Sequence, residues 1–212
     1  MKPCVPRRDW LRGAMMCTGG LLLPAEVWAA LAKTPPLTEG PFYPRELPLD
    51  DDNDLTQVKG RSGVAAGIVL DLAGRVVDTE GRPVANALVE IWQCNANGRY
   101  QDSRDDNPAA LDPNFQGFGK FVTDAEGGYR FRTIKPVAYP GRTPHIHFKV
   151  KSREFRELTT QMFVAGEPGN ERDGIWRSIR DEALRKRMTV EFRPAAPDSG
   201  AKLSGDFEIV VG

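Results

Sequence analysis

Two histidines placed two positions apart are the strongest chemical signal in this sequence. His145 and His147 are the two histidines of the 212-residue chain. The run that contains them is predicted to be a β-strand, in which alternate side chains share a face. Both imidazoles are therefore expected on one face, with Ile146 pointing the other way into apolar surroundings. A pair of imidazoles on a strand commonly supplies two ligands to a metal. The alternative, a plain surface pair, is disfavoured because both histidines of the chain occur at this one spot.

The other available ligands limit which metal such a site would bind. Three scattered cysteines and the lack of a third histidine argue against a structural zinc site. Carboxylates are plentiful, which leaves open an iron(II) site made of two histidines and one carboxylate. Phenolates are hard anionic ligands that favour ferric iron. The sequence offers four candidates of this kind, namely Tyr43, Tyr100, Tyr129 and Tyr139.

The elements that must position these residues are predicted to be mostly short strands. The balance of 29 basic and 29 acidic residues gives no global field toward nucleic acid, and 17 Pro with 21 Gly suit a turn-rich β protein. A long loop over residues 94–118 is expected to be functional. We predict an all-β fold, an antiparallel β-sandwich with long loops and one short C-terminal helix near residues 175–188. The strands are expected at residues 67–72, 74–78, 87–93, 120–123, 129–134, 145–150, 160–164, 190–192 and 207–211.

The N-terminal region of the chain is predicted to be a targeting segment followed by an extended arm. Arg7 and Arg8 precede an apolar stretch too short to span a bilayer, which resembles a twin-arginine export signal over residues 1–32. We expect export to the periplasm or the exterior, with no stable membrane anchor. Residues 33–60 are rich in Pro and Asp and are expected to run as an extended arm. One catalytic domain is expected over residues 33–212.

Several motifs in this order resemble the intradiol ring-cleavage dioxygenases, nearest to the branch of the catalytic, beta-type subunit of protocatechuate 3,4-dioxygenase. The resemblance spans roughly residues 37–165. Its motifs are Gly40-Pro41-Phe42-Tyr43-Pro44, the run from Val89 to Tyr100, the run from Leu111 to Gly117, Phe131 to Pro136, and Pro144 to Phe148. The segment between Tyr139 and His145 is shorter than in the protocatechuate enzymes, which leaves the ligand positions intact and alters the expected substrate pocket.

The resemblance implies a set of site residues and a cofactor. It implies non-haem Fe(3+) held by Tyr100, Tyr139, His145 and His147. It further implies that Tyr139 accepts a substrate proton, that Arg142 places a positive charge beside the ring, and that Gln161 lines the pocket. Tyr43 is expected either at the pocket mouth or packed on the sandwich, and Trp92 in the core.

The implied activity is opening of a catechol-type ring by O₂ to a cis,cis-muconate-type diacid. The implied partners are a small catechol-type substrate and O₂, without nucleic acid, in an oligomer with itself or with a related subunit. Two other interpretations stay open. One is a non-catalytic transthyretin-like binding module, suggested by the Gly-x-Val-x-Asp pattern that begins at Gly74. The other is an iron(II) or zinc hydrolase with two histidines and a carboxylate.

Overall fold

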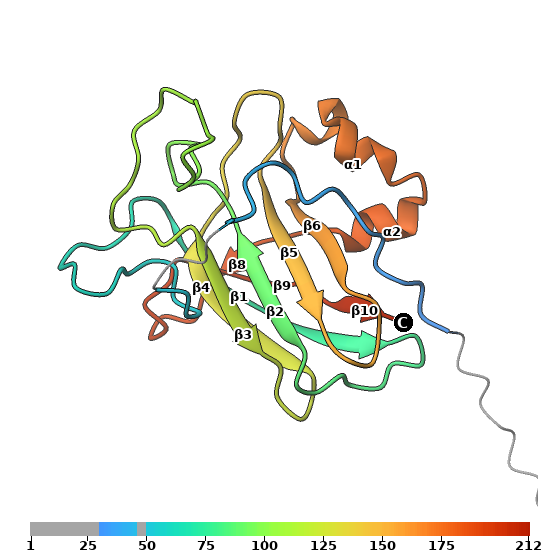
Figure 1. Cartoon of the computed structure of the whole chain (residues 1–212). Helices are drawn as coiled ribbons and strands as arrows, with labels where there is room; N and C mark the ends of the chain where they lie inside the picture. Colours follow the sequence, from blue (N-terminus) through green and yellow to red (C-terminus); the bar gives the residue numbers. More distant parts are fainter. Residues whose placement is uncertain (1–29, 46–49) are drawn as a thin grey trace, which may run out of the picture.

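The computed structural model describes residues 30–45 and 50–212, which form a pair of mixed sheets packed face to face (Figure 1). The strands are β1 (Val69–Asp78), β2 (Leu88–Trp92), β3 (Phe118–Val122), β4 (Gly128–Ile134), β5 (His145–Lys151), β6 (Leu158–Val164), β7 (Thr189–Val190), β8 (Arg193–Pro194), β9 (Leu203–Asp206) and β10 (Ile209–Val211). The helices are a 3₁₀ turn at Asn170–Arg172, α1 (Gly174–Ser178) and α2 (Glu182–Arg187).

The two sheets confirm the predicted all-β sandwich and add three parallel pairings to it. In the first sheet β1 pairs antiparallel with β4 and parallel with β9 and β10, and β8 pairs antiparallel with β9. The second sheet has the order β3-β2-β5-β6-β7 and is antiparallel except at the β6–β7 edge. The parallel pairs form because the C-terminal segment returns beside β1, and the residues after α2 return beside β6.

The core lies between the sheets and follows the alternation of each strand. On β5, Ile146, Phe148 and Val150 are fully buried in the main apolar cluster. His145, His147 and Lys149 leave the opposite face, as the two-residue spacing predicted. These three are nearly buried as well, so this strand is covered on both faces. Something other than the first sheet must therefore cover its outer face.

The Pro-rich arm provides some of that cover. The arm begins beside β10 and crosses β6 and β5, where Figure 1 shows it in blue in front of the second sheet. Leu37 N–H donates to Thr159 O at 2.9 Å, and Thr160 Oγ1 donates to Pro35 O at 2.8 Å. The extended arm predicted for this region is thus fixed to the edge of the sheet that carries both histidines.

The single helix predicted over residues 175–188 is wrong, because two short helices occupy this region. The chain is extended at Ile179, whose ψ is 91° and whose side chain is buried in the core. Asp181 then starts α2 by accepting a hydrogen bond from Leu184 N–H. The insertion of Ile179 into the core ends one helix, and the cap begins the next.

The predicted signal segment, residues 1–32, lies outside the described residues except for its last three positions. Among the helices of the described chain, none has the length and apolar character that a membrane crossing requires.

Candidate metal centre

His145 and His147 lie at the start of β5, and their Nε2 atoms point toward each other. The two Nε2 atoms are 3.2 Å apart, and the ring centroids are 4.8 Å apart. Both side chains are buried, with 2% and 3% of their surface exposed. The structure thus brings this predicted pair together at a distance that suits two ligands of one ion.

The two imidazoles are oriented in different ways. Nδ1 of His145 donates to the carbonyl oxygen of Thr143 at 2.6 Å, which leaves its Nε2 as the free lone pair. His147 instead stacks on Trp92, with ring centroids 4.8 Å apart and an interplanar angle of 10°. Within the residues that the structure describes, Nδ1 of His147 is buried without a hydrogen-bond partner.

Tyr100 enters the site from the long loop that joins β2 to β3. The loop is held by its own polar side chains: Asn95 Oδ1 accepts from Asn97 and Arg99 N–H, and Asp105 Oδ2 accepts from Tyr100 N–H at 2.7 Å. The Tyr100 ring is 3% exposed and lies 6.2 Å from the His147 ring. Its hydroxyl is buried and unpartnered among the described residues.

Tyr139 enters from a tight turn between β4 and β5. Its ring centroid lies 5.6 Å from that of Tyr100 and 5.5 Å from that of His145. Tyr139 and Arg142 form a small bridge, in which Arg142 N–H donates to Tyr139 O at 2.9 Å. The turn is completed by Gly141 at a φ of +81°. The four ligands predicted from the sequence therefore lie together.

The four side chains fit a ferric ion in their chemistry. Burial lowers the pKa of His145 to about 3, with a further contribution from the Arg142 charge. Burial also holds the pKa of His147 well below its usual value, so both imidazoles are neutral and can donate lone pairs. Desolvation raises the pKa of Tyr100 and of Tyr139 above 10, so neither phenol ionises unless a cation supplies compensating charge.

A carboxylate-containing site finds less support. Across residues 30–45 and 50–212, no cluster of three or more His, Cys, Asp or Glu side chains is placed to hold a metal. The oxygen donors beside the two histidines are instead phenols, one of them an orphaned buried hydroxyl. This donor set matches a hard trivalent cation better than zinc or iron(II).

Arg142 is fixed beside the histidines by two partners. Its Nε donates to Asp173 Oδ2 at 2.9 Å, and its Nη2 donates to Gln161 Oε1 at 2.5 Å. Gln161 stands opposite His147 in the β5–β6 register and donates its Nε2 to Thr38 O at 2.8 Å. The predicted pair of Arg142 and Gln161 is thus one hydrogen-bonded unit that also binds the arm.

Sequence reasoning missed Asp173, whereas the burial expected for Trp92 is confirmed. Asp173 is 2% exposed and accepts from Arg142, from Thr143 N–H and from the first N–H groups of α1. An Asp directly before a short helical run predicts a helix cap, but it does not predict that the carboxylate also binds Arg142. Trp92, expected in the core, packs in a second cluster with Cys94, Tyr100 and Phe118. The pairing of Trp92 with His147 across β2 and β5 brings it to the site.

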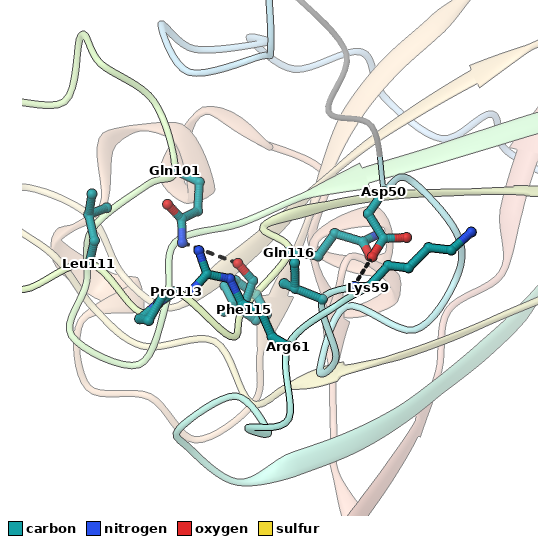
Figure 2. Close-up of a pocket in the computed structure, with 9 residues that line it drawn as sticks. Asp50, Lys59, Arg61, Gln101, Leu111, Pro113, Phe115 and Gln116 are labelled. Atoms are coloured by element: carbon teal, nitrogen blue, oxygen red, sulfur yellow. Dashed lines mark hydrogen bonds between the residues drawn. The ribbon is translucent and has the colours of Figure 1, made fainter.

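Two cavities lie on the side of the site formed by the long loop. One of about 90 Å³ reaches Tyr100 and Trp92 and is bounded by Phe42 from the arm. A larger one of about 770 Å³ adjoins it, and Figure 2 shows Leu111 at one end, Lys59 and Asp50 at the other, and the Arg61 side chain between them. Gln101 and Gln116 line both cavities.

Comparison with known proteins agrees with this geometry. A family model described as Dioxygenase matches residues 38–211. The chain is 44% identical over 168 residues to the protocatechuate 3,4-dioxygenase beta chain of Burkholderia cepacia, an alignment that covers 76% of this chain and 71% of that protein. The chain belongs to the intradiol ring-cleavage dioxygenase family. The resemblance drawn from its motifs is confirmed.

Other relatives of this dioxygenase share the domain within longer chains. It is 33% identical over 185 residues to the hydroxyquinol 1,2-dioxygenase of Corynebacterium glutamicum, covering 79% of this chain but only 57% of that protein. Its structure matches the dioxygenase domain of a dioxygenase and carbohydrate-binding fusion protein from Streptomyces sp. SirexAA-E, with a TM-score of 0.64 and 30% identity. That match covers 84% of this chain and 97% of the other. As a family member the chain is an enzyme, and the non-catalytic transthyretin-like interpretation is not favoured.

Proposed function

We propose that this dioxygenase binds one non-haem ferric ion and cleaves a catechol-type ring between its two hydroxyl-bearing carbons. Tyr100, Tyr139, His145 and His147 would hold the ion. The observation that supports this most directly is the convergence of two buried phenols on two histidines whose Nε2 atoms are 3.2 Å apart.

When bound, ferric iron would supply a Lewis acid that takes both catechol oxygens and promotes their deprotonation. In the balanced reaction, one ring and one O₂ give one cis,cis-muconate-type dicarboxylic acid. Both oxygen atoms enter the product, so no external reductant is required.

Tyr139 is the ligand that we assign to proton transfer. Its phenolate oxygen would accept a proton from a substrate hydroxyl, while Tyr100 stays as an anchor. The family resemblance implies this assignment, and the surroundings support it, because Tyr139 is half-buried in a tight turn and Tyr100 is buried in a hydrogen-bonded loop. His145 and His147 lie in the sheet and would anchor the site with Tyr100.

Arg142 would stabilise negative charge that develops on the ring. Its guanidinium is held by Asp173 and Gln161, so its position is set before substrate arrives. Gln161 would add a polar wall to the pocket and hold the arm through Thr38.

The substrate is proposed only as a class. The named relatives act on protocatechuate, hydroxyquinol and catechol, and we infer a small catechol-type substrate for this chain. Assembly with itself or with a related subunit is proposed on the same basis, since one relative is the beta chain of its enzyme. Export through the twin-arginine pathway is proposed from Arg7 and Arg8 alone, and a fusion of residues 1–32 to a reporter protein would test it.

A panel of catechol, protocatechuate and hydroxyquinol tests the activity. Iron-loaded protein is mixed with each compound while O₂ uptake and product absorbance are followed, and ¹⁸O₂ labels the product. The expected result is one O₂ consumed per ring and two labelled atoms in a dicarboxylic acid. Zinc-loaded protein is the control and should be inactive. Formation of a semialdehyde, from cleavage outside the two hydroxyl carbons, would contradict the proposal.

A further inference from the structure

Within residues 30–45 and 50–212, Nδ1 of His147 lacks the hydrogen bond that Nδ1 of His145 makes. The proton-bearing nitrogen of a metal-bound histidine is usually held by a hydrogen-bond acceptor, as Thr143 O holds Nδ1 of His145. Among the described residues Nδ1 of His147 meets no such acceptor, although this ring is just as buried. Apart from the contact of its Nε2 with Nε2 of His145 at 3.2 Å, the orientation of His147 therefore comes from packing.

Two groups pack on the His147 ring. Trp92 stacks on it almost in parallel. Gly40 of the arm meets it at Cε1: a Cβ atom built on Gly40 would lie 3.3 Å from that carbon, and the φ of Gly40 is +72°. The arm backbone can approach this closely because position 40 has no side chain.

A group of charged and aromatic residues holds the arm on both sides of Gly40, and we call it the arm clamp. Its members are Glu39, Tyr43, Glu90, Lys149 and Lys151. Lys149 forms an ion pair with Glu39, and its Nζ lies 3.5 Å above the centre of the Tyr43 ring. The Tyr43 hydroxyl donates to Glu90 Oε2 at 2.9 Å, and Lys151 pairs with the same carboxylate at 3.0 Å.

Along β2 and β5, the clamp residues Glu90 and Lys149 lie two positions from Trp92 and His147. In the β2–β5 register Trp92 stands opposite His147, and Glu90 stands opposite Lys149. Tyr43 connects the two rows, because its ring also packs edge-on against Trp92 at 4.9 Å. The Pro-rich arm is thus fixed by packing on the sandwich, which is one of the two roles expected for Tyr43.

The clamp contains two buried charged side chains, and packing alone does not explain why the chain accepts the free-energy cost of desolvating them. Glu90 is 2% exposed and Lys149 is 6% exposed. Their ion-pair partners, Glu39 and Lys151, keep 44% and 36% of their side-chain surface exposed. Ion pairs of this kind contribute little net stability, and the best-attested use of buried charge is to fix one arrangement among several. The arrangement fixed here is that of Gly40 and Trp92 around His147.

We propose that the arm clamp is a positioning device for His147. Through Gly40 and Trp92 it would fix the imidazole whose Nδ1 no hydrogen bond from the described chain fixes. The inference rests on the proposed function in one respect, since His147 must be an iron ligand for the positioning to affect iron.

Nuclear magnetic resonance of the metal-free, untagged protein tests the positioning without iron. The chain has two histidines, so its imidazole spectrum contains two sets of ring signals. Tyr43→Phe removes the hydroxyl that binds Glu90 and keeps the ring. We expect it to shift and broaden the His147 signals and to leave those of His145 unchanged. Glu90→Gln is a second variant and should act in the same direction.

Iron retention supplies the second readout. Iron-loaded Tyr43→Phe should release its iron to a chelator about 10-fold faster than the wild type, which is the lower end of the usual effect of residues that support metal ligands. Tyr129→Phe is the control, because the Tyr129 hydroxyl likewise donates a hydrogen bond, to Phe207 O, and Tyr129 is not part of the clamp. It should release iron at the wild-type rate.

The outcomes separate the two proposals. Unchanged His147 signals in both clamp variants, or equally fast iron release from Tyr129→Phe, would overturn the clamp and leave the proposed function intact. A wild-type protein that binds no iron would overturn the proposed function, whereas the imidazole signals would still decide whether the clamp orients His147.

Discussion

The two segments that deliver the tyrosines differ in how firmly they are built. Tyr100 lies within a run of Asx turns, its N–H is held by the buried Asp105, and its ring packs with Phe42 at 4.7 Å. Tyr139 lies in a short turn closed by Arg142, and its ring is half-buried. Beyond Tyr139, Gly141 has no neighbour within 4 Å of the place of a Cβ.

The proposed function assigns a division of labour to these two tyrosines, and this difference agrees with it. A phenolate in a rigid loop suits a permanent anchor, and a phenolate in an open turn suits a ligand that also accepts a proton. Four predictions test this division and the buried surroundings of the site, from the largest expected effect to the smallest.

Tyr100→Phe should abolish both iron binding and activity. It removes an anchor whose hydroxyl is already buried without another partner among the described residues, so nothing else there can take its place. Because residues that merely support ligands change affinity by about 10- to 100-fold, loss of an anchoring ligand should lower kcat/KM by about 1,000-fold or more. Iron per chain and kcat/KM are measured, with Tyr129→Phe as the control. Full iron content in Tyr100→Phe would show that Tyr100 is not a ligand.

Tyr139→Phe should retain iron yet lose turnover. The other three ligands remain, and a missing general base lowers kcat by about 100-fold. The measurements are iron content, the visible spectrum and kcat across pH. If Tyr139→Phe loses iron as completely as Tyr100→Phe does, the two tyrosines are equivalent and the division of labour is wrong.

Metal-free protein should lose stability between pH 7 and pH 5, because the ligands in the strand are neutral when folded. The pKa of His145 is lowered to about 3 by burial, whereas an unfolded histidine titrates near 6.5. The unfolded chain therefore gains protons first as the pH falls, and His145 alone should reduce the free energy of unfolding by about 2 kcal/mol over this range. Urea unfolding of the metal-free protein measures it.

The control for this pH effect is His145→Gln, which removes one of the two buried imidazoles and should reduce the pH dependence by about 2 kcal/mol, while His147 keeps its own contribution. A wild-type free energy of unfolding that is equal at both pH values would mean that the imidazoles are not buried in neutral form.

Asp173→Asn should remove the ion pair that fixes Arg142, the residue that closes the Tyr139 turn. Asparagine can still cap α1 but no longer carries the charge that holds the guanidinium of Arg142. We expect kcat to fall by about 10-fold, with iron content unchanged. Asp181→Asn is the control, because Asp181 caps α2 in the same way without an arginine. Equal losses in both variants would assign the effect to helix capping.

Much of the site was predictable because its signals are local. Alternation along residues 145–150 places both histidines on one face and Ile146 in the core, as the structure confirms. The tyrosines carried no such local signal, and only the motif resemblance selected Tyr100 and Tyr139 from the four. Each lies in an irregular segment whose path depends on side-chain hydrogen bonds.

What escaped prediction depends on contacts between distant regions of the chain. The predicted strands at residues 67–72 and 74–78 are one strand, β1, whose parallel partners lie more than 120 positions later. Asp173 and Arg142 meet across 31 positions, and Trp92 reaches His147 only through the sheet register. Local pattern cannot supply a register between separate segments.

Resonance Raman spectroscopy of the iron-loaded protein tests the central claim most directly, with total iron measured on the same sample. Excitation in the visible band of a ferric phenolate reports which phenols bind the ion. We predict one iron per chain, phenolate vibrations in the wild type, and a spectrum altered differently by Tyr100→Phe and by Tyr139→Phe. A wild-type protein that takes up no iron, or one whose iron gives no phenolate vibrations, would contradict the account.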